Sequence, residues 1–306
     1  MNALVGYTGF VGSNIYAAGN FDAVYNSKNI EEAYGTKPDL LIYAGVRAEK
    51  YLANNEPEKD MEQIVQAEEN LAKIDPRKLV LISTIDIFKI PKDVDETTQV
   101  DTSGLLPYGY NRYQLELWVR KNYPEALIVR LPGLFGANIK KNFIYDYLNA
   151  IPSALADAKM KELLRLDDRL KDYYHKQDNG FYRLNSISVE EGKVLKEKFT
   201  RIGFSALNFT DSRSRYQFYD LNRLWGDLQT ALEHAVRVWH PATEPISAGE
   251  LYRYLTGDIF VNELEMVPVD YDYRTIHAEL FGGRNGYICD KSVVLEEIRK
   301  FVKDKK

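Results

Sequence analysis

The stretch Ala3–Asn14, with the sequence ALVGYTGFVGSN, decides the fold. Three apolar residues of a short strand are followed by Gly6, Gly9 and Gly12, and an apolar helix begins within the same stretch. Glycines between a strand and a helix permit a tight turn and let the backbone approach a ligand closely, while the unpaired N–H groups of the helix N-terminus attract phosphate. The stretch therefore predicts a dinucleotide-binding loop.

Apolar runs and amphipathic segments alternate over the first half of the chain, which is the order that builds a parallel sheet covered by helices. We expect strands at Ala3–Val5, Ala23–Tyr25, Leu40–Tyr43, Leu79–Ile82 and Ala126–Arg130, and helices at Gly12–Ala18, Glu56–Ile74 and Tyr113–Lys121. The predicted fold class is α/β, with a doubly wound parallel sheet of the Rossmann type.

The pattern changes after Gly136. Residues 143–174 have helical spacing and no expected strand, and further helices are expected over Leu221–Ala235 and Lys291–Lys303. We therefore assign residues 1–138 and 205–235 to the dinucleotide-binding Rossmann domain. Residues 139–204 and 236–306 are expected to form a smaller, mainly helical substrate-binding part.

Composition excludes several classes of protein. The 306 residues carry a net charge of -5 with scattered Lys and Arg, so no footprint for nucleic acid is expected. Cys289 is the only cysteine, which rules out an intramolecular disulfide and a Cys-based zinc cluster, and no apolar run reaches the roughly 18 residues of a membrane span. The four histidines show no paired ligand spacing, so no metal is expected. We expect a soluble, cytoplasmic protein.

Four further motifs follow the glycine loop in order. They are LIYAGV at Leu41–Val46, STIDIF at Ser83–Phe88, YGYNR at Tyr108–Arg112 and VRLPGLFG at Val129–Gly136. Together with the Gly-x-x-Gly-x-x-Gly spacing of the loop, they resemble the extended short-chain dehydrogenases/reductases, the family of NAD(P)-dependent epimerases, dehydratases and sugar reductases. The resemblance covers about the first 136 residues.

The resemblance implies a catalytic site with a Ser or Thr, a Tyr and a Lys. Tyr108 would be the acid/base, Thr84 would hold the substrate oxygen, and Arg112 stands where the family has Lys. A cation one helical turn from a tyrosine lowers its pKa from the usual value near 10 toward neutral. Arg keeps the charge, but its planar and always protonated fork is aimed differently, so the replacement is not conservative.

The resemblance also implies a set of cofactor-binding residues. They are Gly6, Thr8, Gly9, Phe10, Val11, Gly12, Asn26, Lys28, Ala44, Gly45, Tyr108, Arg112 and Pro132. Asn26 stands where relatives that prefer NAD have a carboxylate on the ribose, and Lys28 could attract a 2′-phosphate. We therefore expect NADP, with NAD as the alternative.

The implied substrate is a nucleotide-linked sugar, handled by reduction, epimerisation or dehydration through a Thr-Tyr-Arg variant of the family site. Two alternatives stay open from the residues alone. One is a non-catalytic dinucleotide-binding sensor or scaffold, because Arg112 departs from the motif. The other is a reductase of a small non-nucleotide carbonyl compound, because no motif after residue 140 can be tied to a nucleobase. The expected partner is a small molecule, and a homodimer is allowed.

Overall fold

The structure, a computed structural model that describes residues 1–305, divides into two compact units. Unit 1 comprises Met1–Ile139, Arg215–Ser247 and Val269–Phe301, and unit 2 comprises Lys140–Ser214, Ala248–Pro268 and the residues from Val302 onward. Residues 236–247 and 269–301, which we expected in the substrate-binding part, thus group with the N-terminal residues. Which segments bind substrate stays a prediction.

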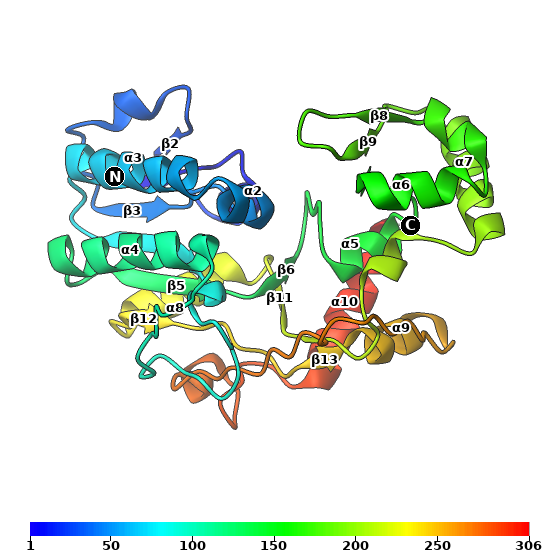
Figure 1. The fold of residues 1–306 in the computed structure, drawn as a ribbon. Helices are drawn as coiled ribbons and strands as arrows, with labels where there is room; N and C mark the ends of the chain where they lie inside the picture. The colour runs from blue at the N-terminus through cyan, green and yellow to red at the C-terminus, as the bar shows by residue number, and fades with distance from the viewer. Residues whose placement is uncertain (306) are drawn as a thin grey trace. The chain divides into compact units, whose positions relative to one another are not determined.

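Unit 1 is built on one sheet of six parallel strands (Figure 1). Their order across the sheet is β2 (Ala23–Tyr25), β1 (Asn2–Val5), β3 (Leu40–Tyr43), β4 (Leu79–Thr84), β5 (Leu127–Leu131) and β12 (Val238–Trp239). The chain crosses from β1 to β2 on one side and then returns to place β3 on the other side of β1. This reversal of direction is the topology of a doubly wound sheet, so the predicted fold class is confirmed.

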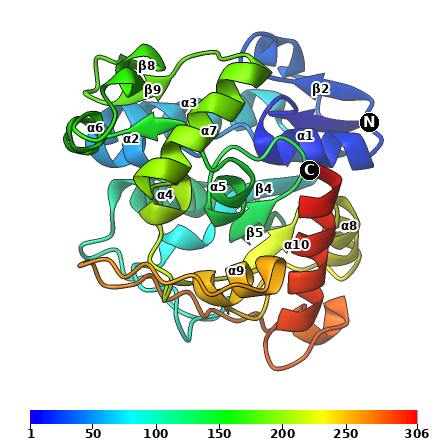
Figure 2. The ribbon, with the colours of Figure 1, turned by 90° about the vertical axis from the view of Figure 1, so that its right-hand side faces the viewer.

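Helices cover both faces of this sheet. They are α1 (Phe10–Ala18) and α8 (Leu224–Glu233) on one face, and α2 (Lys50–Asn55), α3 (Pro57–Ile74) and α4 (Pro107–Asn122) on the other. Figure 2 shows the two groups on opposite sides of the strands, and α1 packs on α8 as α3 packs on α4. The sheet is buried between two helical layers, which is why its strands are mainly apolar.

The spacing of apolar residues explains how α3 docks. Ile64, Ala67, Leu71 and Ile74 recur at intervals of three and four, so they share one helix face, and all four are buried. That face packs in one core cluster with strand residues such as Leu41, and with residues of α4. The docking of α3 and α4 on the sheet follows directly from this pattern.

The remaining elements of unit 1 are short, apart from the last helix. They are the strands β6 (Gly133–Phe135), β10 (Arg215–Tyr216), β11 (Phe218–Asp220) and β13 (Ile246–Ser247), the 3-10 turns η1 (Ile30–Ala33), η2 (Ile85–Ile87) and η5 (Ala278–Phe281), and the helix α10 (Lys291–Lys305), whose last residues belong to unit 2. β6 pairs with β11 in parallel, and β10 pairs with β13 antiparallel.

Unit 2 corrects one expectation. It contains α5 (Phe143–Leu148), β7 (Ala154–Leu155), α6 (Asp157–Leu164), η3 (Asp168–Asp172), β8 (Tyr174–Lys176), β9 (Tyr182–Leu184), α7 (Val189–Ile202), η4 (Ala206–Phe209) and α9 (Ala248–Thr256). Residues 143–174 were expected to hold no strand, yet β7 lies among them. The two residues of β7 pair with β9, which also pairs with β8. β7 therefore forms by pairing with a strand that lies outside residues 143–174.

Candidate active site

The predicted site residues meet at one edge of the sheet. Gly6 follows β1, Asn26 follows β2, Ala44 follows β3, Thr84 ends β4 and Pro132 follows β5. Because all these strands are parallel, their carboxyl ends lie on the same side. Open α/β sheets bind ligands at this edge, beside the point where the strand order reverses.

The glycine loop is packed against its neighbours without room for side chains. Gly6 has a φ of +90°, and a Cβ there would lie 2.3 Å from the carbonyl oxygen of Ala44. A Cβ on Gly12 would lie 2.1 Å from the carbonyl oxygen of Gly6. Only glycine fits at either position. The loop after β1, the loop after β3 and the first turn of α1 are therefore in direct backbone contact.

Gly9 differs from the other two glycines because it is exposed and a Cβ there would make a tight contact without overlapping the backbone. It is the N-cap of α1, with an ordinary φ of -77°, and a Cβ there would meet only the Gly6 carbonyl oxygen, at 3.3 Å. The first N–H groups of a helix have no partners within the helix and point outward at such an end. The loop thus offers an unobstructed N-terminus, flanked by exposed Thr8 and half-buried Phe10 and Val11.

The loop after β2 leaves Lys28 exposed. The side-chain oxygen of Asn26 accepts a hydrogen bond from the Lys28 backbone N–H at 2.8 Å, and Asn29 closes the turn by accepting from the Asn26 N–H at 2.8 Å. Gly6 donates to the carbonyl of Tyr25 at 2.7 Å, which joins this turn to the glycine loop. Lys28 therefore extends from the same edge of the sheet, with no carboxylate at position 26.

Thr84 and Tyr108 lie together at the end of β4. Tyr108 is in the first turn of α4 and is buried, and its hydroxyl is hydrogen-bonded to the side chain of Thr84. Ser83, the neighbouring hydroxyl, instead donates to the buried carboxylate of Glu116 at 2.6 Å. The geometry therefore brings Thr84, and not Ser83, to the tyrosine.

Burial dominates the acidity of Tyr108. Removal from water raises its pKa to about 12, although the charge of Arg112 lowers it, and the carboxylate of Asp86 adds to the rise. Hydrogen bonding with Thr84 lowers this pKa, and the charge of Asp60 raises it. A tyrosine in this state keeps its proton at neutral pH, so it is suited to donate one.

Arg112 is held under the ring of Tyr108 by a buried ion pair. Its guanidinium carbon lies 4.1 Å from the ring centroid. One nitrogen pairs with Asp60 of α3, and another donates to the Arg47 carbonyl at 2.5 Å. Asn111 also donates to Asp60, at 2.8 Å. Arg112 therefore lies beside Tyr108, as the sequence predicted. Its charge is paired with the carboxylate of Asp60, which is 52 residues earlier in the chain.

The pair predicts a large effect on folding. Arg112→Met should lower the free energy of unfolding by about 3 to 5 kcal/mol, because Asp60 would be left as an unpaired buried charge. Denaturant unfolding measures the loss, and Arg77→Met is the control, since its pair with Asp39 is exposed and such pairs contribute about 0 to 1 kcal/mol. If both variants lost the same free energy of unfolding, the Arg112–Asp60 pair would not be the stabilising contact that we describe.

Solved structures share this architecture. A dTDP-4-dehydrorhamnose reductase from Bacillus anthracis, in complex with NADP, matches with a TM-score of 0.63 and 15% identity, over 99% of this chain and 97% of that one. A UDP-glucose 4-epimerase from Thermotoga maritima, with UDP-glucose, gives 0.56 and 13%, over 99% and 98%. A short-chain dehydrogenase/reductase superfamily protein from Agrobacterium tumefaciens, with bound NAD, gives 0.60 and 15%, over 100% and 98%.

The chain has the short-chain dehydrogenase/reductase fold. The fold that the motifs implied is thereby confirmed, and the structural likeness covers 99% of the chain in the first of these matches and 100% in the third. No family model matches the sequence, and no curated protein matches it significantly.

A second buried network joins β5 to α4 and to His240 in unit 1. Arg130 of β5 makes three hydrogen bonds to Glu116 of α4, between 2.8 and 3.2 Å, and a fourth to Nε2 of His240 at 3.2 Å. Nδ1 of His240 donates to the Arg274 carbonyl at 3.0 Å. Burial and the charge of Arg130 lower the pKa of His240 to about 3, so the ring is neutral and serves packing.

Three side chains beside Tyr108 were not singled out from sequence. Asp86 receives hydrogen bonds from Thr84 at 3.1 Å and from the hydroxyl of Tyr271 at 2.9 Å, and Lys50 pairs with it at 2.6 Å. Asp86 follows Thr84 by two positions, and that spacing is a signal for a local side-chain turn. Lys50 and Tyr271 carry no comparable local signal.

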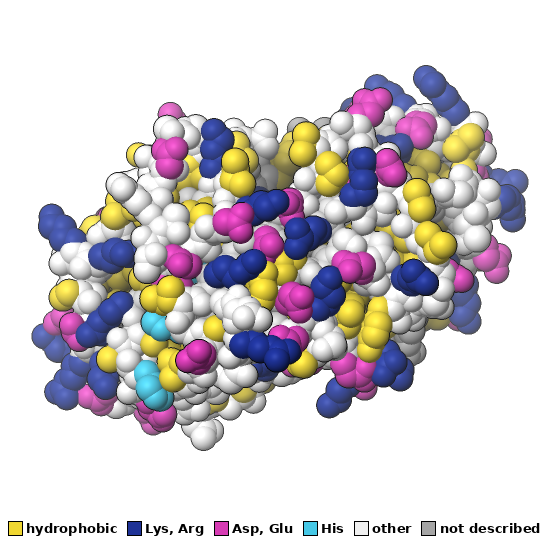
Figure 3. All heavy atoms as spheres, turned by 90° about the horizontal axis from the view of Figure 1, so that it is seen from below, with side chains coloured by type: hydrophobic (Ala, Val, Ile, Leu, Met, Phe, Trp, Pro, Cys, Tyr) yellow, Lys and Arg dark blue, Asp and Glu magenta, His cyan; other side chains and the backbone are white. Residues whose placement is uncertain are grey.

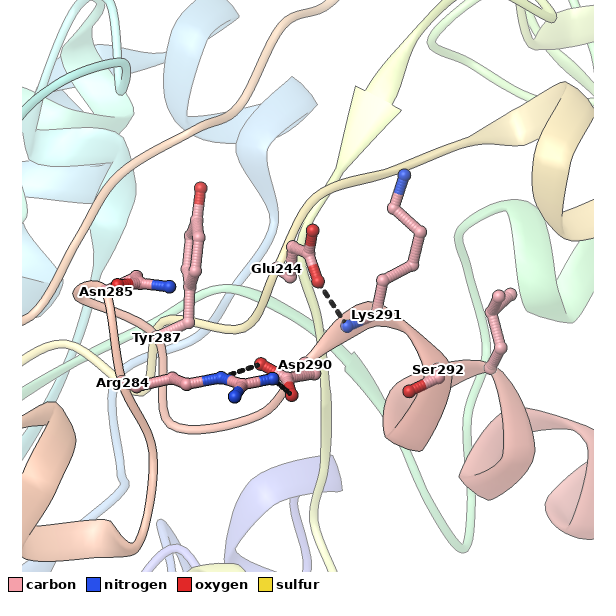
Figure 4. Close-up of a pocket in the computed structure, with 8 residues that line it drawn as sticks. Glu244, Arg284, Asn285, Tyr287, Asp290, Lys291 and Ser292 are labelled. Atoms are coloured by element: carbon pink, nitrogen blue, oxygen red, sulfur yellow. Dashed lines mark hydrogen bonds and ion pairs between the residues drawn. The ribbon is translucent and has the colours of Figure 1, made fainter.

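In residues 1–305, no group of His, Cys, Asp and Glu could hold a metal, and no helix is long and apolar enough to cross a membrane. On the face in Figure 3, basic side chains alternate with acidic ones. A cavity of about 500 Å³ lies in unit 1 beside α10, where Arg284 pairs with Asp290 and Glu244 accepts from the Lys291 N–H (Figure 4). None of the predicted site residues lines it.

Proposed function

We propose that this protein is an NADP-dependent oxidoreductase that reduces a carbonyl group of a nucleotide-linked sugar. The observation that carries the proposal is the hydrogen-bonded pair of Thr84 and Tyr108, on the same sheet edge as an open glycine loop. The matched reductase and epimerase, by their descriptions, act on dTDP- and UDP-linked sugars. These neighbours support the substrate class.

The residues present fit a dinucleotide. The open N-terminus of α1 at Gly9 suits the pyrophosphate, the turn at Asn26 and Lys28 suits the adenosine ribose, and Ala44, Gly45 and Pro132 line the route toward Tyr108. When bound, the reduced nicotinamide supplies a hydride to the carbonyl carbon. Tyr108 gives its hydroxyl proton to the carbonyl oxygen, Thr84 orients that oxygen, and Arg112 holds the tyrosine ring in place.

The raised pKa of Tyr108 keeps its hydroxyl in the protonated form that a reduction uses. A group with a pKa of about 12 is in its acid form throughout the neutral range, and the acid form is what a reduction consumes. An oxidation or an epimerisation begins with a base, which this environment disfavours. We therefore place reduction ahead of the epimerase and dehydratase reactions.

Cofactor preference gives a direct prediction. NADPH should bind more tightly than NADH, and Lys28→Ala should narrow the difference by about 1 to 3 kcal/mol, because one charge-assisted contact to the 2′-phosphate is lost. Calorimetry of both dinucleotides measures the difference. Lys37→Ala, which removes an exposed lysine paired with Asp75, is the control and should change neither affinity. Equal binding of NADPH and NADH by the unaltered protein would refute the preference.

The function is tested in two steps. Mass spectrometry of nucleotides that copurify with the native protein identifies the cofactor and any sugar nucleotide. NADPH consumption is then followed with dTDP-4-dehydrorhamnose and with a panel of UDP- and GDP-linked keto sugars. Turnover of at least one of them, well above the rate with small ketones and aldehydes, is expected. Turnover of small carbonyl compounds alone would establish the non-nucleotide reductase instead.

A second candidate function rests on Arg112. Because its guanidinium is committed to Asp60 and to the Arg47 carbonyl, the site could hold a dinucleotide without the electrostatic tuning that turnover needs. A non-catalytic sensor would bind NADPH tightly and consume none with any sugar. Arg112→Lys creating turnover where the unaltered protein has none would favour this sensor.

A further inference from the structure

Helix α2 brings a lysine to Tyr108. The side-chain oxygen of Asn54 accepts a hydrogen bond from the Tyr108 backbone N–H at 2.9 Å, which fixes α2 against the first turn of α4. Lys50 begins α2, and its Nζ lies 5.8 Å from the centroid of the Tyr108 ring. Since 48% of its side chain is exposed, this ammonium group contacts both the site and the solvent.

Asp86 connects this lysine to the site hydroxyls. Its Oδ2 atom lies 2.6 Å from Nζ of Lys50 and accepts a hydrogen bond from the hydroxyl of Thr84 at 3.1 Å. Its other oxygen accepts from Tyr271 at 2.9 Å, which fixes the plane of the carboxylate. One oxygen of Asp86 therefore lies between an ammonium group and the hydroxyl that adjoins Tyr108.

The directions of these hydrogen bonds follow from the groups themselves. The Thr84 hydroxyl donates its single proton to Asp86. The Thr84 oxygen therefore acts as an acceptor in its other two hydrogen bonds, from the Asp86 backbone N–H at 3.2 Å and from the hydroxyl of Tyr108. An unbroken path of hydrogen bonds runs from the oxygen of Tyr108 through Thr84 and Asp86 to the ammonium of Lys50. We call these four residues the Lys50 relay.

We propose that the Lys50 relay returns a proton to Tyr108 after each reduction. This inference rests on the proposed function. Once Tyr108 has given its proton to the substrate oxygen, a phenolate remains. Lys50 first gives a proton to the Asp86 carboxylate, and the protonated Asp86 then gives it to the oxygen of Thr84. The Thr84 hydroxyl, turned from Asp86 toward Tyr108, gives its own proton to the phenolate oxygen. The result is a neutral tyrosine and a neutral amine, and the exposed amine takes a proton from water.

Other groups around Tyr108 do not offer this route. Arg112 and Asp60 face it from α4 and α3, and they are paired with each other. A guanidinium group does not release its proton in proteins. Tyr271 donates to the opposite oxygen of Asp86, and burial raises its own pKa. Lys50 is thus the group on the path that can both give a proton and recover one from solvent.

The decisive comparison is Lys50→Arg with Lys50→Met, assayed with NADPH and dTDP-4-dehydrorhamnose or the best sugar of the screen. Arg keeps the positive charge beside Asp86 but cannot give up its proton, so both variants should lose about tenfold or more in kcat with little change in KM. In Lys50→Ala, added ethylammonium should restore part of the lost kcat, in proportion to its concentration. Wild-type kcat in Lys50→Arg, or no recovery with ethylammonium, overturns the relay.

Two controls separate the relay from its premises. Lys73→Met removes a lysine with similar contacts and should leave kcat unchanged. Lys73 forms an ion pair with Glu69 at 3.4 Å, and its Nζ lies 5.2 Å from the ring centroid of Tyr34. Tyr108→Phe should reduce turnover by about 10² to 10⁴. If Tyr108→Phe shows this loss and Lys50→Arg is fully active, the proposed function stands and the relay is wrong. If Tyr108→Phe is fully active, both are wrong.

Discussion

Gly9→Val is expected to weaken dinucleotide binding by about 100-fold or more, which corresponds to about 2.7 kcal/mol or more, in a protein that remains folded. The φ of -77° at Gly9 is open to any L-residue, and the added Cβ would meet only the Gly6 carbonyl oxygen, at 3.3 Å. Folding should therefore tolerate the change. The isopropyl group would instead occupy the space over the N-terminus of α1, where a pyrophosphate must approach the backbone.

Calorimetry with NADPH measures the loss, and thermal unfolding followed by circular dichroism shows that the fold persists. Gly226→Val is the matched control, because this glycine lies in α8 and a Cβ there meets no atom within 4 Å. The control should bind NADPH as the unaltered protein does. Unchanged affinity in Gly9→Val would remove the dinucleotide site from this loop and, with it, the basis of the proposed function.

Tyr108→Phe should reduce turnover by about 10² to 10⁴, the range expected when a positioned acid is removed. The substitution deletes one oxygen and keeps the ring that lies 4.1 Å from the Arg112 guanidinium, so NADPH affinity and unfolding should change little. Steady-state rates with the best sugar of the screen give the loss. The loss should appear in kcat, because the proton is transferred in the transition state.

Tyr110→Phe is the matched control for this prediction. Tyr110 lies on the same helix two positions later, and 39% of it is exposed. Its hydroxyl is the nearest alternative in the YGYNR motif. A large loss in Tyr110→Phe together with a small one in Tyr108→Phe would move the acid to Tyr110 and invalidate the site described above.

Local patterns were sufficient to place the first five strands of the six-stranded sheet and the glycine turn between β1 and α1. Strands β2 and β3 have the predicted bounds, because apolar runs closed by polar or glycine residues signal buried strands. The helix expected over Tyr113–Lys121 begins six residues earlier, at Pro107. Glycine disfavours helices, yet Gly109 lies in the first turn of α4. In the structure a Cβ on Gly109 would lie 2.0 Å from the Asp86 carbonyl oxygen, so the glycine lets α4 approach η2 closely.

Local sequence patterns could not predict contacts between residues that are distant in the chain. Asp60 appears in the sequence as one of several charges on an amphipathic helix, yet it is 4% exposed and balances Arg112. Only the packing of α3 on α4 brings the two together. The sixth strand, β12, was not predicted because it too depends on a partner distant in the chain. Its two residues, Val238 and Trp239, lie just beyond the expected segment 205–235 and form a strand through pairing with β5.

The contacts of Gly6 and Gly12 bear on how fast and how firmly a dinucleotide can be captured. Gly6 is packed against the Ala44 carbonyl and Gly12 against the Gly6 carbonyl, so two of the three loop glycines are held by backbone contacts before a ligand binds. A preorganised loop loses little conformational entropy when its ligand arrives, so nearly all of the interaction energy appears as affinity. Capture then needs no slow rearrangement of this segment, and the encounter rate is set by diffusion and orientation.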